Sequence, residues 1–423
     1  MAEVRSPHSS SQEKAFVNGK WFTGKEFQST TFYSVNGILT NRKPAGPVEI
    51  VDLQGGYVVP AFADAHSHFP NTEQNFETAN RAFLEAGVFY VLNAGGDAEK
   101  ENPLRSKLGA TTTVDVIFAH SVFTCPGGHP KPYLEYLKEH GAEFGVPFAK
   151  SKLEDHYFRM IDSVADIDRE WPQFLSTNPD FVKLIFVFSE LYKSSDGNEK
   201  SMGLRPELAE ELVHRAKTAG LRTGAHIEDA ADFHNAVAVG VDMVMHLPAF
   251  PDPLDRQGAY RNKANWEERY TISAFDIELA ARRGITVVTT AAALSAENFE
   301  NPNPLTALNE NEKRFRKIMI QNLQRLKDGG VRLAVGSDTK PGSGVLTEID
   351  FLKEATVFSN FELLKMWSEA TPRAVFPQRK IGALQEGFEA NFLVLEGNPI
   401  LDFANAKKIK MRVKQGEPLS ENY

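Results

Sequence analysis

The sequence predicts an α/β protein, a (β/α)8 TIM-like barrel with a small β-sandwich domain formed by both chain ends. Three observations support this fold class. Short apolar strands alternate with helical stretches from residue 57 to about 375, strand-like segments punctuated by glycine precede them, and similar segments return after about residue 383. We therefore expect a barrel over 61–375 and a small sheet domain from 14–60 plus 376–423.

The N-terminal region has two parts, a polar segment and a strand-like segment. Residues 1–13 are polar, and we expect them to be disordered. The segments FVNGKWF and YSVNGILT that follow each carry Asn-Gly between apolar or aromatic residues, the strongest short-range signal for a β-hairpin. They predict a small antiparallel sheet.

The central region supplies eight strand candidates, and the stretches between them have helical periodicity. PELAEELVHRAKTAG (206–220) and FRKIMIQNLQRLKDGG (315–330) are examples, the latter stopping on two glycines. No GxGxxG follows the first strand, which disfavours a dinucleotide-binding sheet. The predicted strands are 57–66, 88–94, 114–120, 181–188, 221–227, 242–247, 285–292 and 332–338.

Composition limits the function classes. The chain of 423 residues has a net charge of -9, which disfavours nucleic acid as a partner, and it has no apolar run long enough to cross a membrane. Its polar N-terminus has no signal peptide as written, so we expect a cytoplasmic protein, or an exported one if a signal peptide has been removed. The single cysteine, Cys125, excludes an internal disulfide and a cysteine-rich zinc site. A small molecule is the expected partner, and a homo-oligomer is compatible with the sequence.

Histidines and one aspartate fall where a barrel carries its chemistry, at the carboxyl ends of strands. His66 and His68 end the first predicted strand and point to the same side of it. His226, His246 and Asp338 end the fifth, sixth and eighth strands. Neutral imidazole and carboxylate are usual ligands of zinc and similar divalent ions, so these residues are candidate metal ligands.

Lys183 is unusual because it lies inside the apolar strand FVKLIFVF. A buried ammonium is costly and offers no lone pair to a metal. It can instead pair with a carboxylate, or react with carbon dioxide to give a carbamate that bridges two cations. Each candidate has an ordinary explanation when taken alone: a loop histidine, a paired lysine, or an aspartate in a turn. That all these explanations hold together at separate strand ends is improbable, which favours a metal site.

At these residues the chain resembles the amidohydrolase superfamily, and the subgroup of imidazolonepropionase-related and Xaa-Pro dipeptidase-like members is the most similar. The resemblance rests on ADAHSHF, FVKLIF, TGAHIED, VMHLP, AVGSDT and the tail motif GALQEGFEANFLVLEGNP. It implies one or two divalent ions, most often zinc. His66 and His68 would bind one ion with Asp338, while His226 and His246 bind the second and a carboxylated Lys183 bridges the two.

The predicted function is hydrolysis of an amide C–N bond of a small substrate, such as a dipeptide or N-acyl amino acid, by a metal-activated hydroxide. Asp338 is the predicted catalytic proton acceptor. A cyclic amide of the imidazolonepropionase type, or a lactone or ester, is the alternative substrate, and a non-catalytic binding relative is a third interpretation. His129, in a Gly-Gly-His stretch, and Arg256 and Tyr260, in a long loop, are candidate substrate contacts; a turn and a solvated loop are their alternatives.

After His226, Glu228 and Asp229 are candidates either for orienting this histidine or for capping a helix.

Overall fold

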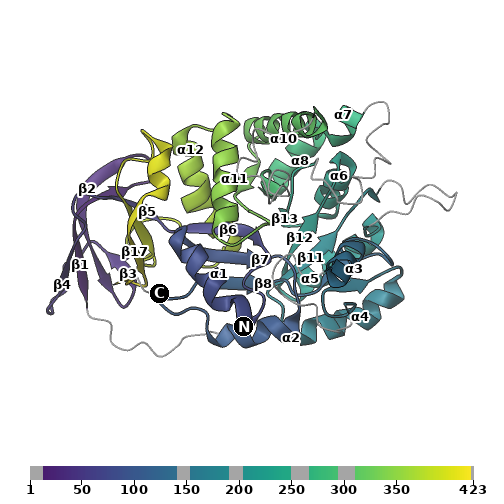
Figure 1. The fold of residues 1–423 in the computed structure, drawn as a ribbon, viewed down its shortest axis with the longest axis horizontal. Coiled ribbons are helices and arrows are strands. Elements are labelled where there is room, and N and C mark those ends of the chain that lie inside the picture. Colours follow the sequence, from purple (N-terminus) through teal and green to yellow (C-terminus); the bar gives the residue numbers. More distant parts are fainter. Residues whose placement is uncertain (1–12, 141–152, 190–202, 249–265, 294–309, 421–423) are drawn as a thin grey trace.

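The structure, a computed structural model, describes residues 13–140, 153–189, 203–248, 266–293 and 310–420. A small sheet lies at one end of the molecule, and the remaining strands, with helices on either side of them, form the larger part (Figure 1). Within the described ranges, every helix is too short or too polar to cross a membrane.

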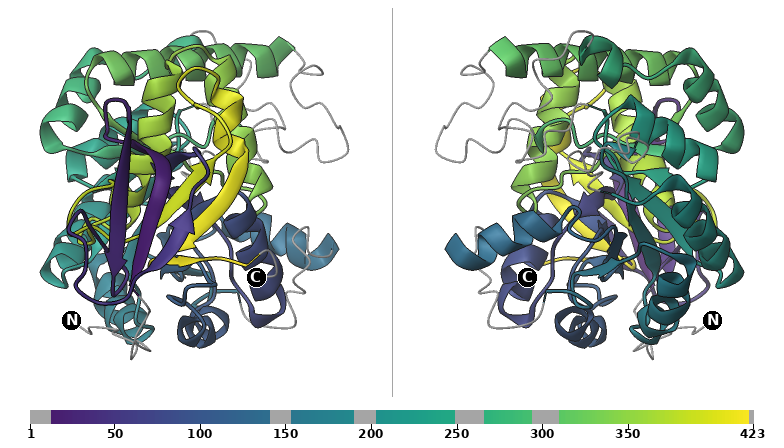
Figure 2. Two further views of the ribbon diagram at one scale, coloured as in Figure 1. Left: turned by 90° about the vertical axis from the view of Figure 1, so that its left-hand side faces the viewer. Right: turned by 90° about the vertical axis from the view of Figure 1, so that its right-hand side faces the viewer.

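The small sheet joins both ends of the chain, as predicted. Strands near the N-terminus lie beside strands near the C-terminus (Figure 2). The order is β18-β17-β16-β5-β1-β2-β3, with β4 paired to β1. The prediction of an antiparallel sheet is wrong in part, because β1 pairs in parallel with β4 and with β5. The bounds are β1 Lys14–Phe22, β2 Phe27–Val35, β3 Ile38–Thr40, β4 Glu49–Asp52, β5 Tyr57–Pro60, β16 Phe392–Leu395, β17 Ile409–Lys414 and β18 Glu417–Pro418.

The two Asn-Gly pairs have different structures. Asn36 and Gly37 have positive φ and connect β2 to antiparallel β3, which confirms the hairpin predicted there. The hairpin predicted at Asn18-Gly19 is wrong, because both residues lie inside β1 at a break in its register with β2. The positive φ of Asn18 suits a β-bulge as well as a turn, so the dipeptide alone does not distinguish them. The two-layered sandwich arrangement stays a prediction.

The larger part contains parallel strands that close into a barrel. One sheet has the order β6-β7-β8, and a second has the order β10-β9-β11-β12-β13-β14-β15. Backbone hydrogen bonds from Ala65 to Val335 and from Asp180 to Phe118 join the sheets on both sides. The barrel bounds are β6 Phe62–Ser67, β7 Val88–Asn93, β8 Asp115–Phe118, β11 Phe181–Ile185, β12 Arg222–His226, β13 Met243–Val244, β14 Thr286–Val288 and β15 Arg332–Ala334.

Two short strands were not predicted. β9 (Val122–Thr124) and β10 (Phe158–Met160) pair in parallel with each other, and β9 also contacts β11. Both are only three residues long, which is too short to show a periodicity in the sequence.

Helices begin and end where local chemistry predicts. Asp229 caps α6 in a reciprocal capping box, and Gly240 ends it in the left-handed conformation. The helices predicted in 206–220 and 315–330 are confirmed as α5 and α10. The remaining bounds are α1 Glu73–Glu85, α2 Ala98–Glu101, α3 Lys131–His140, α4 Val164–Ser176, α5 Pro206–Thr218, α6 Ala230–Val239, α7 Trp266–Tyr270, α8 Ala274–Arg283, α10 Glu310–Asp328, α11 Ser343–Glu354, α12 Asn360–Lys365 and α13 Thr371–Val375.

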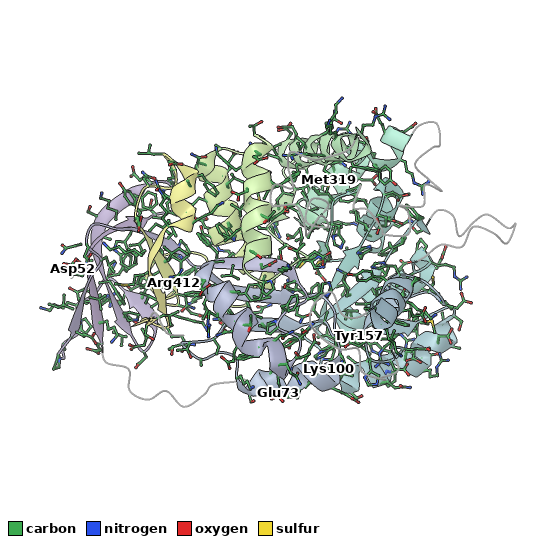
Figure 3. All side chains as sticks on the ribbon, viewed as in Figure 1. Asp52, Glu73, Lys100, Tyr157, Met319 and Arg412 are labelled. Carbon is green, nitrogen blue, oxygen red and sulfur yellow. The ribbon has the colours of Figure 1, made fainter. Side chains whose placement is uncertain are left out.

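Buried charged groups connect the barrel to the small sheet. Lys414 of β17 is fully buried and pairs with Asp115 of β8 at 2.7 Å. Arg412, labelled in Figure 3, donates to the carbonyl of Leu84 at the end of α1 over 2.6 Å. The domain division at residues 61 and 375 stays a prediction.

Candidate metal centre

His66 and His68 turn their Nε2 atoms toward one carboxylate. Nδ1 of His66 donates to the Met245 carbonyl at 3.0 Å, and Nδ1 of His68 donates to the Gly95 carbonyl at 2.8 Å. The Nε2 atoms therefore face Oδ1 of Asp338, at 3.5 Å for His66 and 3.1 Å for His68. Burial opposes protonation of His68, but its hydrogen bond to Asp338 outweighs burial and raises the pKa of His68. His66 is buried, while the His68 side chain is 45% exposed and is the more open of the two.

His226 ends β12, and His246 follows the neighbouring strand β13 by two residues. Nδ1 of His246 lies 2.8 Å from Oγ1 of Thr290, and Nε2 lies 4.0 Å from Oδ2 of Asp338. His226 is held through its other nitrogen, because Nε2 lies 2.9 Å from Oε1 of buried Glu228. The His226 and His246 rings are 4.4 Å apart, and the His66 and His246 rings are 4.6 Å apart.

Asp338 reaches the histidines because the end of β15 packs tightly against β6. The N–H groups of Ser337 and Asp338 both donate to the His66 carbonyl. Asp338 has φ +52, a left-handed conformation that aspartate adopts more readily than most residues. Gly336 permits this close approach, since a Cβ there would lie 2.8 Å from the Cβ of His66.

Lys183 is buried in β11 beside the histidines. β11 pairs with β12 so that Lys183 is opposite Gly224, two residues before His226. Within the described residues its ammonium forms no hydrogen bond or ion pair, so the paired-lysine alternative finds no carboxylate partner there. Burial lowers the pKa of Lys183 to about 7, against the attraction of Asp338. A substantial fraction is then a neutral amine, the form that reacts with carbon dioxide.

Electrostatics favour the protonation states that metal ligands require at His66, His226, His246 and Asp338. Burial lowers the pKa of His66 to about 3, and it lowers the pKa values of His226 and His246 well below 6.5. Burial also opposes the ionisation of Asp338, but His66 and His68 outweigh it and bring the pKa to about 2. The buried imidazoles are therefore neutral while the aspartate is charged.

These residues fit a divalent cation. Donor atoms of His66, His246 and Asp338 all lie within 4.8 Å of one another. The Nδ1 atoms of His66, His68 and His246 are each engaged in a hydrogen bond to another protein group. A ligand set of imidazole nitrogens and carboxylate oxygens suits zinc.

The other predicted contacts have mixed outcomes. His129 lies at the centre, because its ring stacks on that of His226 with centroids 4.5 Å apart. Arg256 and Tyr260 lie outside the described residues. Both roles considered for the pair after His226 occur, since Glu228 bonds the histidine and Asp229 caps α6.

Sequence reasoning missed two buried residues that support the ligands. Asp64, two positions before His66, accepts from the His66 N–H and from Oγ of Ser337 at 2.6 Å. Burial raises the pKa of Asp64 to about 7, although the Ser337 hydroxyl and the backbone N–H groups of His66 and Ser337 oppose the shift. Thr290 orients His246. Asp64 could have been noticed in ADAHSH, whereas Thr290 carries no local signal.

A second group of candidate ligands lies apart from the predicted set and contains Asp97, Glu99 and His156. Nδ1 of His156 lies 3.1 Å from Asp97, whose other oxygen is 3.6 Å from the Lys100 ammonium. Lys100 also donates to the hydroxyl of Tyr157 at 2.7 Å, and both residues are labelled in Figure 3. A cation would have to compete with this lysine, so the group is an ordinary charged cluster.

Comparison with known proteins decides the family. A model of the amidohydrolase family matches residues 190–419, more than half of the chain. The chain belongs to the amidohydrolase family. The predicted superfamily membership is thereby confirmed. Three of the predicted ligands, His226, His246 and Asp338, lie inside the matched region, whereas the His66–His68 pair and Lys183 precede it.

Individual relatives of the amidohydrolase chain are distant. An ochratoxinase of Aspergillus niger is 25% identical over 213 residues, which cover 49% of this chain and only 39% of that protein. A solved Xaa-Pro dipeptidase structure with bound methionine has a TM-score of 0.71 at 16% identity, covering 97% of this chain and 100% of that one. The solved ochratoxinase structure has a TM-score of 0.70 at 17% identity, with 96% of each chain covered. These likenesses confirm the barrel fold.

Proposed function

We propose that this protein is a metal-dependent amidohydrolase that cleaves an amide C–N bond of a small substrate. The observation that carries the proposal is the convergence of donor atoms from His66, His246 and Asp338 within 4.8 Å. Two further imidazoles, His68 and His226, adjoin them. Membership of the amidohydrolase family supports the same reaction class.

The proposed ligands are His66, His68, His226, His246 and Asp338, with zinc as the first candidate metal. A bound divalent ion supplies Lewis acidity, which polarises a substrate carbonyl and makes water a stronger nucleophile at neutral pH. Carboxylation of Lys183 would add a sixth ligand: its neutral amine forms a bond to the carbon of carbon dioxide and releases one proton. The buried, partner-free state of this lysine in the described residues supports that step.

Asp338 is the proposed catalytic base. It stays ionised at neutral pH, and its oxygens face three imidazoles at 3.1–4.0 Å. From this position it can accept the proton of an attacking water and later return it to the leaving nitrogen. His129, stacked on His226, is a proposed substrate contact.

The proposed substrates are dipeptides and N-acyl amino acids. Arg256 and Tyr260 remain proposed contacts to a substrate carboxylate. Similarity to proteins named Xaa-Pro dipeptidase and ochratoxinase supports a search in this class. The test combines zinc content with turnover across dipeptides, N-acyl amino acids, cyclic amides and lactones. Preferential turnover of lactones would overturn the amide assignment, and absence of bound metal from active protein would overturn the metal-dependent mechanism.

Asp338→Asn isolates the proposed base. We expect turnover to fall by about 10²–10⁴-fold, the usual contribution of a general base, while most of the metal remains bound. Metal content and turnover should be measured on the same preparation. Full activity in this variant would reject the role of Asp338.

A further inference from the structure

Glu348, in the middle of α11, is a fully buried carboxyl that binds the backbone of another element. The Ala292 N–H donates to its Oε2 at 2.6 Å, and the N–H of Ala291 also bonds the carboxyl. These two residues follow β14, the seventh barrel strand. Oε1 of Glu348 and Oγ1 of Thr289 form no regular hydrogen bond within the described part of the chain. The carboxyl thus links α11 to the carboxyl end of β14.

The residue immediately before this contact is strained. Thr290 has φ +37, although a β-branched residue strongly disfavours the left-handed region. Such a conformation costs on the order of 1–3 kcal/mol and persists only where the surroundings enforce it. The two N–H groups held by Glu348 follow Thr290 directly, so the carboxyl restrains the chain at the strained point.

The strained threonine contacts the proposed metal centre. Its Oγ1 lies 2.8 Å from Nδ1 of His246 and 3.4 Å from the Met245 carbonyl. The same carbonyl accepts from Nδ1 of His66 at 3.0 Å. If the hydroxyl donates to the carbonyl, it must accept from Nδ1 of His246. That tautomer leaves Nε2 of His246 with the lone pair facing Asp338.

We propose that Glu348 is a positioning residue: it holds Thr290 in the left-handed conformation and thereby fixes His246 with Nε2 directed into the metal site. The metal part of this inference rests on the proposed function. Burial raises the pKa of Glu348 to about 7, and it outweighs nearby polar groups, including the N–H groups of Ala292 and Ala291, which lower it. An uncharged side chain of the same shape can therefore perform the task.

Two measurements on purified protein test the proposal. One is zinc affinity, by competition with a chelator. The other is hydrogen exchange of residues 286–293 in metal-free protein, which needs no bound zinc. For Glu348→Leu we expect faster exchange there and zinc affinity about 10–100-fold weaker. Glu348→Gln should stay within about threefold of the parent affinity, because its amide oxygen can still accept the N–H groups.

Thr290→Val completes a double-mutant cycle, since it retains the β-branch but loses the hydroxyl. It should weaken zinc binding by a similar factor, and Glu348→Leu combined with Thr290→Val should weaken it no further than the worse single variant. A control is Glu369→Gln, which alters another buried glutamate, beside Gly24 and Lys365. It should change neither zinc affinity nor exchange of 286–293.

Parent-like zinc affinity or unchanged hydrogen exchange in folded Glu348→Leu would overturn the proposal. It would also be overturned if the double variant lost zinc affinity by the product of the two single-variant factors. If Glu348→Leu does not fold, Glu348→Asp is judged by the same criteria, because it retracts the carboxyl by one methylene. A parent protein that binds no zinc refutes the proposed function instead, and the exchange comparison then still decides whether Glu348 restrains the strand end.

Discussion

Replacing Gly336 with alanine tests whether the contact between β15 and β6 sets the metal centre. A Cβ at this position would lie 2.4 Å from Cγ1 of Val288, 2.8 Å from the Cβ of His66 and 3.0 Å from the His66 nitrogen. Ordinary contact begins at 3.4 Å, so the separation from the His66 Cβ must grow from 2.8 to 3.4 Å, by 0.6 Å. The strand end that must move carries Asp338, and two backbone hydrogen bonds tie it to the His66 carbonyl.

Two effects are expected from a displacement of this size. Overpacking a well-filled interior destabilises a protein by about 1–3 kcal/mol. A ligand set must also hold its geometry within about 0.5 Å, which a movement of 0.6 Å exceeds. We therefore expect Gly336→Ala to lower zinc affinity and kcat/KM by about 10–100-fold each.

The assays are chemical denaturation of metal-free protein, a zinc titration, and turnover of the best amide substrate. Gly46→Ala is the matched control, because its added Cβ would meet only Oε2 of Glu13, at 3.5 Å. Parent-like stability and zinc affinity in Gly336→Ala would refute the steric argument. Lost stability with normal zinc affinity would show that the strand end moves without disturbing the ligands.

Three other outcomes follow from the described contacts. The pKa of Glu348 is raised from 4.5 to about 7 in the folded protein, so its contribution to stability is present below pH 4.5 and is lost as pH rises through 7. Between pH 5 and 8, the melting temperature of the metal-free protein should therefore fall more steeply for the parent than for Glu348→Gln. Parallel curves of melting temperature against pH would contradict this. Asp115→Asn, which removes the charge paired with buried Lys414, should lower the free energy of unfolding by about 3–5 kcal/mol in urea, against at most about 1 kcal/mol for Asp168→Asn at an exposed pair. Adding zinc at about 100 times its dissociation constant should stabilise the metal-free protein by about 2.7 kcal/mol, and an unchanged melting temperature would argue against a site in the native state.

Much of the proposed site could be predicted because its signal is local. His66 and His226 lie at the ends of β6 and β12, and Asp338 follows β15 by four residues, while parallel barrel strands present their carboxyl ends on one face. Strand ends therefore predict proximity without knowledge of the packing. The same local logic predicted α5 and α10, whose periodicity and terminal residues lie within one segment.

Where several structures satisfy the same local pattern, the sequence was less informative. Asn18-Gly19 suits a bulge as well as a hairpin, and only the pairing of β1 with β2 shows the bulge. β9 and β10 are too short for a period, and they are strands because backbone partners lie alongside them. The parallel pairing of β1 with β4 also depends on where a distant segment packs.

By itself, the sequence determined the alternation of strands and helices, the return of the chain to a small sheet, and the residue types that surround the proposed metal. The tertiary structure alone decided which groups orient those residues. Glu348 meets the backbone at Ala292 across 56 residues, and Asp64 meets Ser337 across 273. Such contacts follow from how closely separate elements pack, and no local pattern of side chains encodes them.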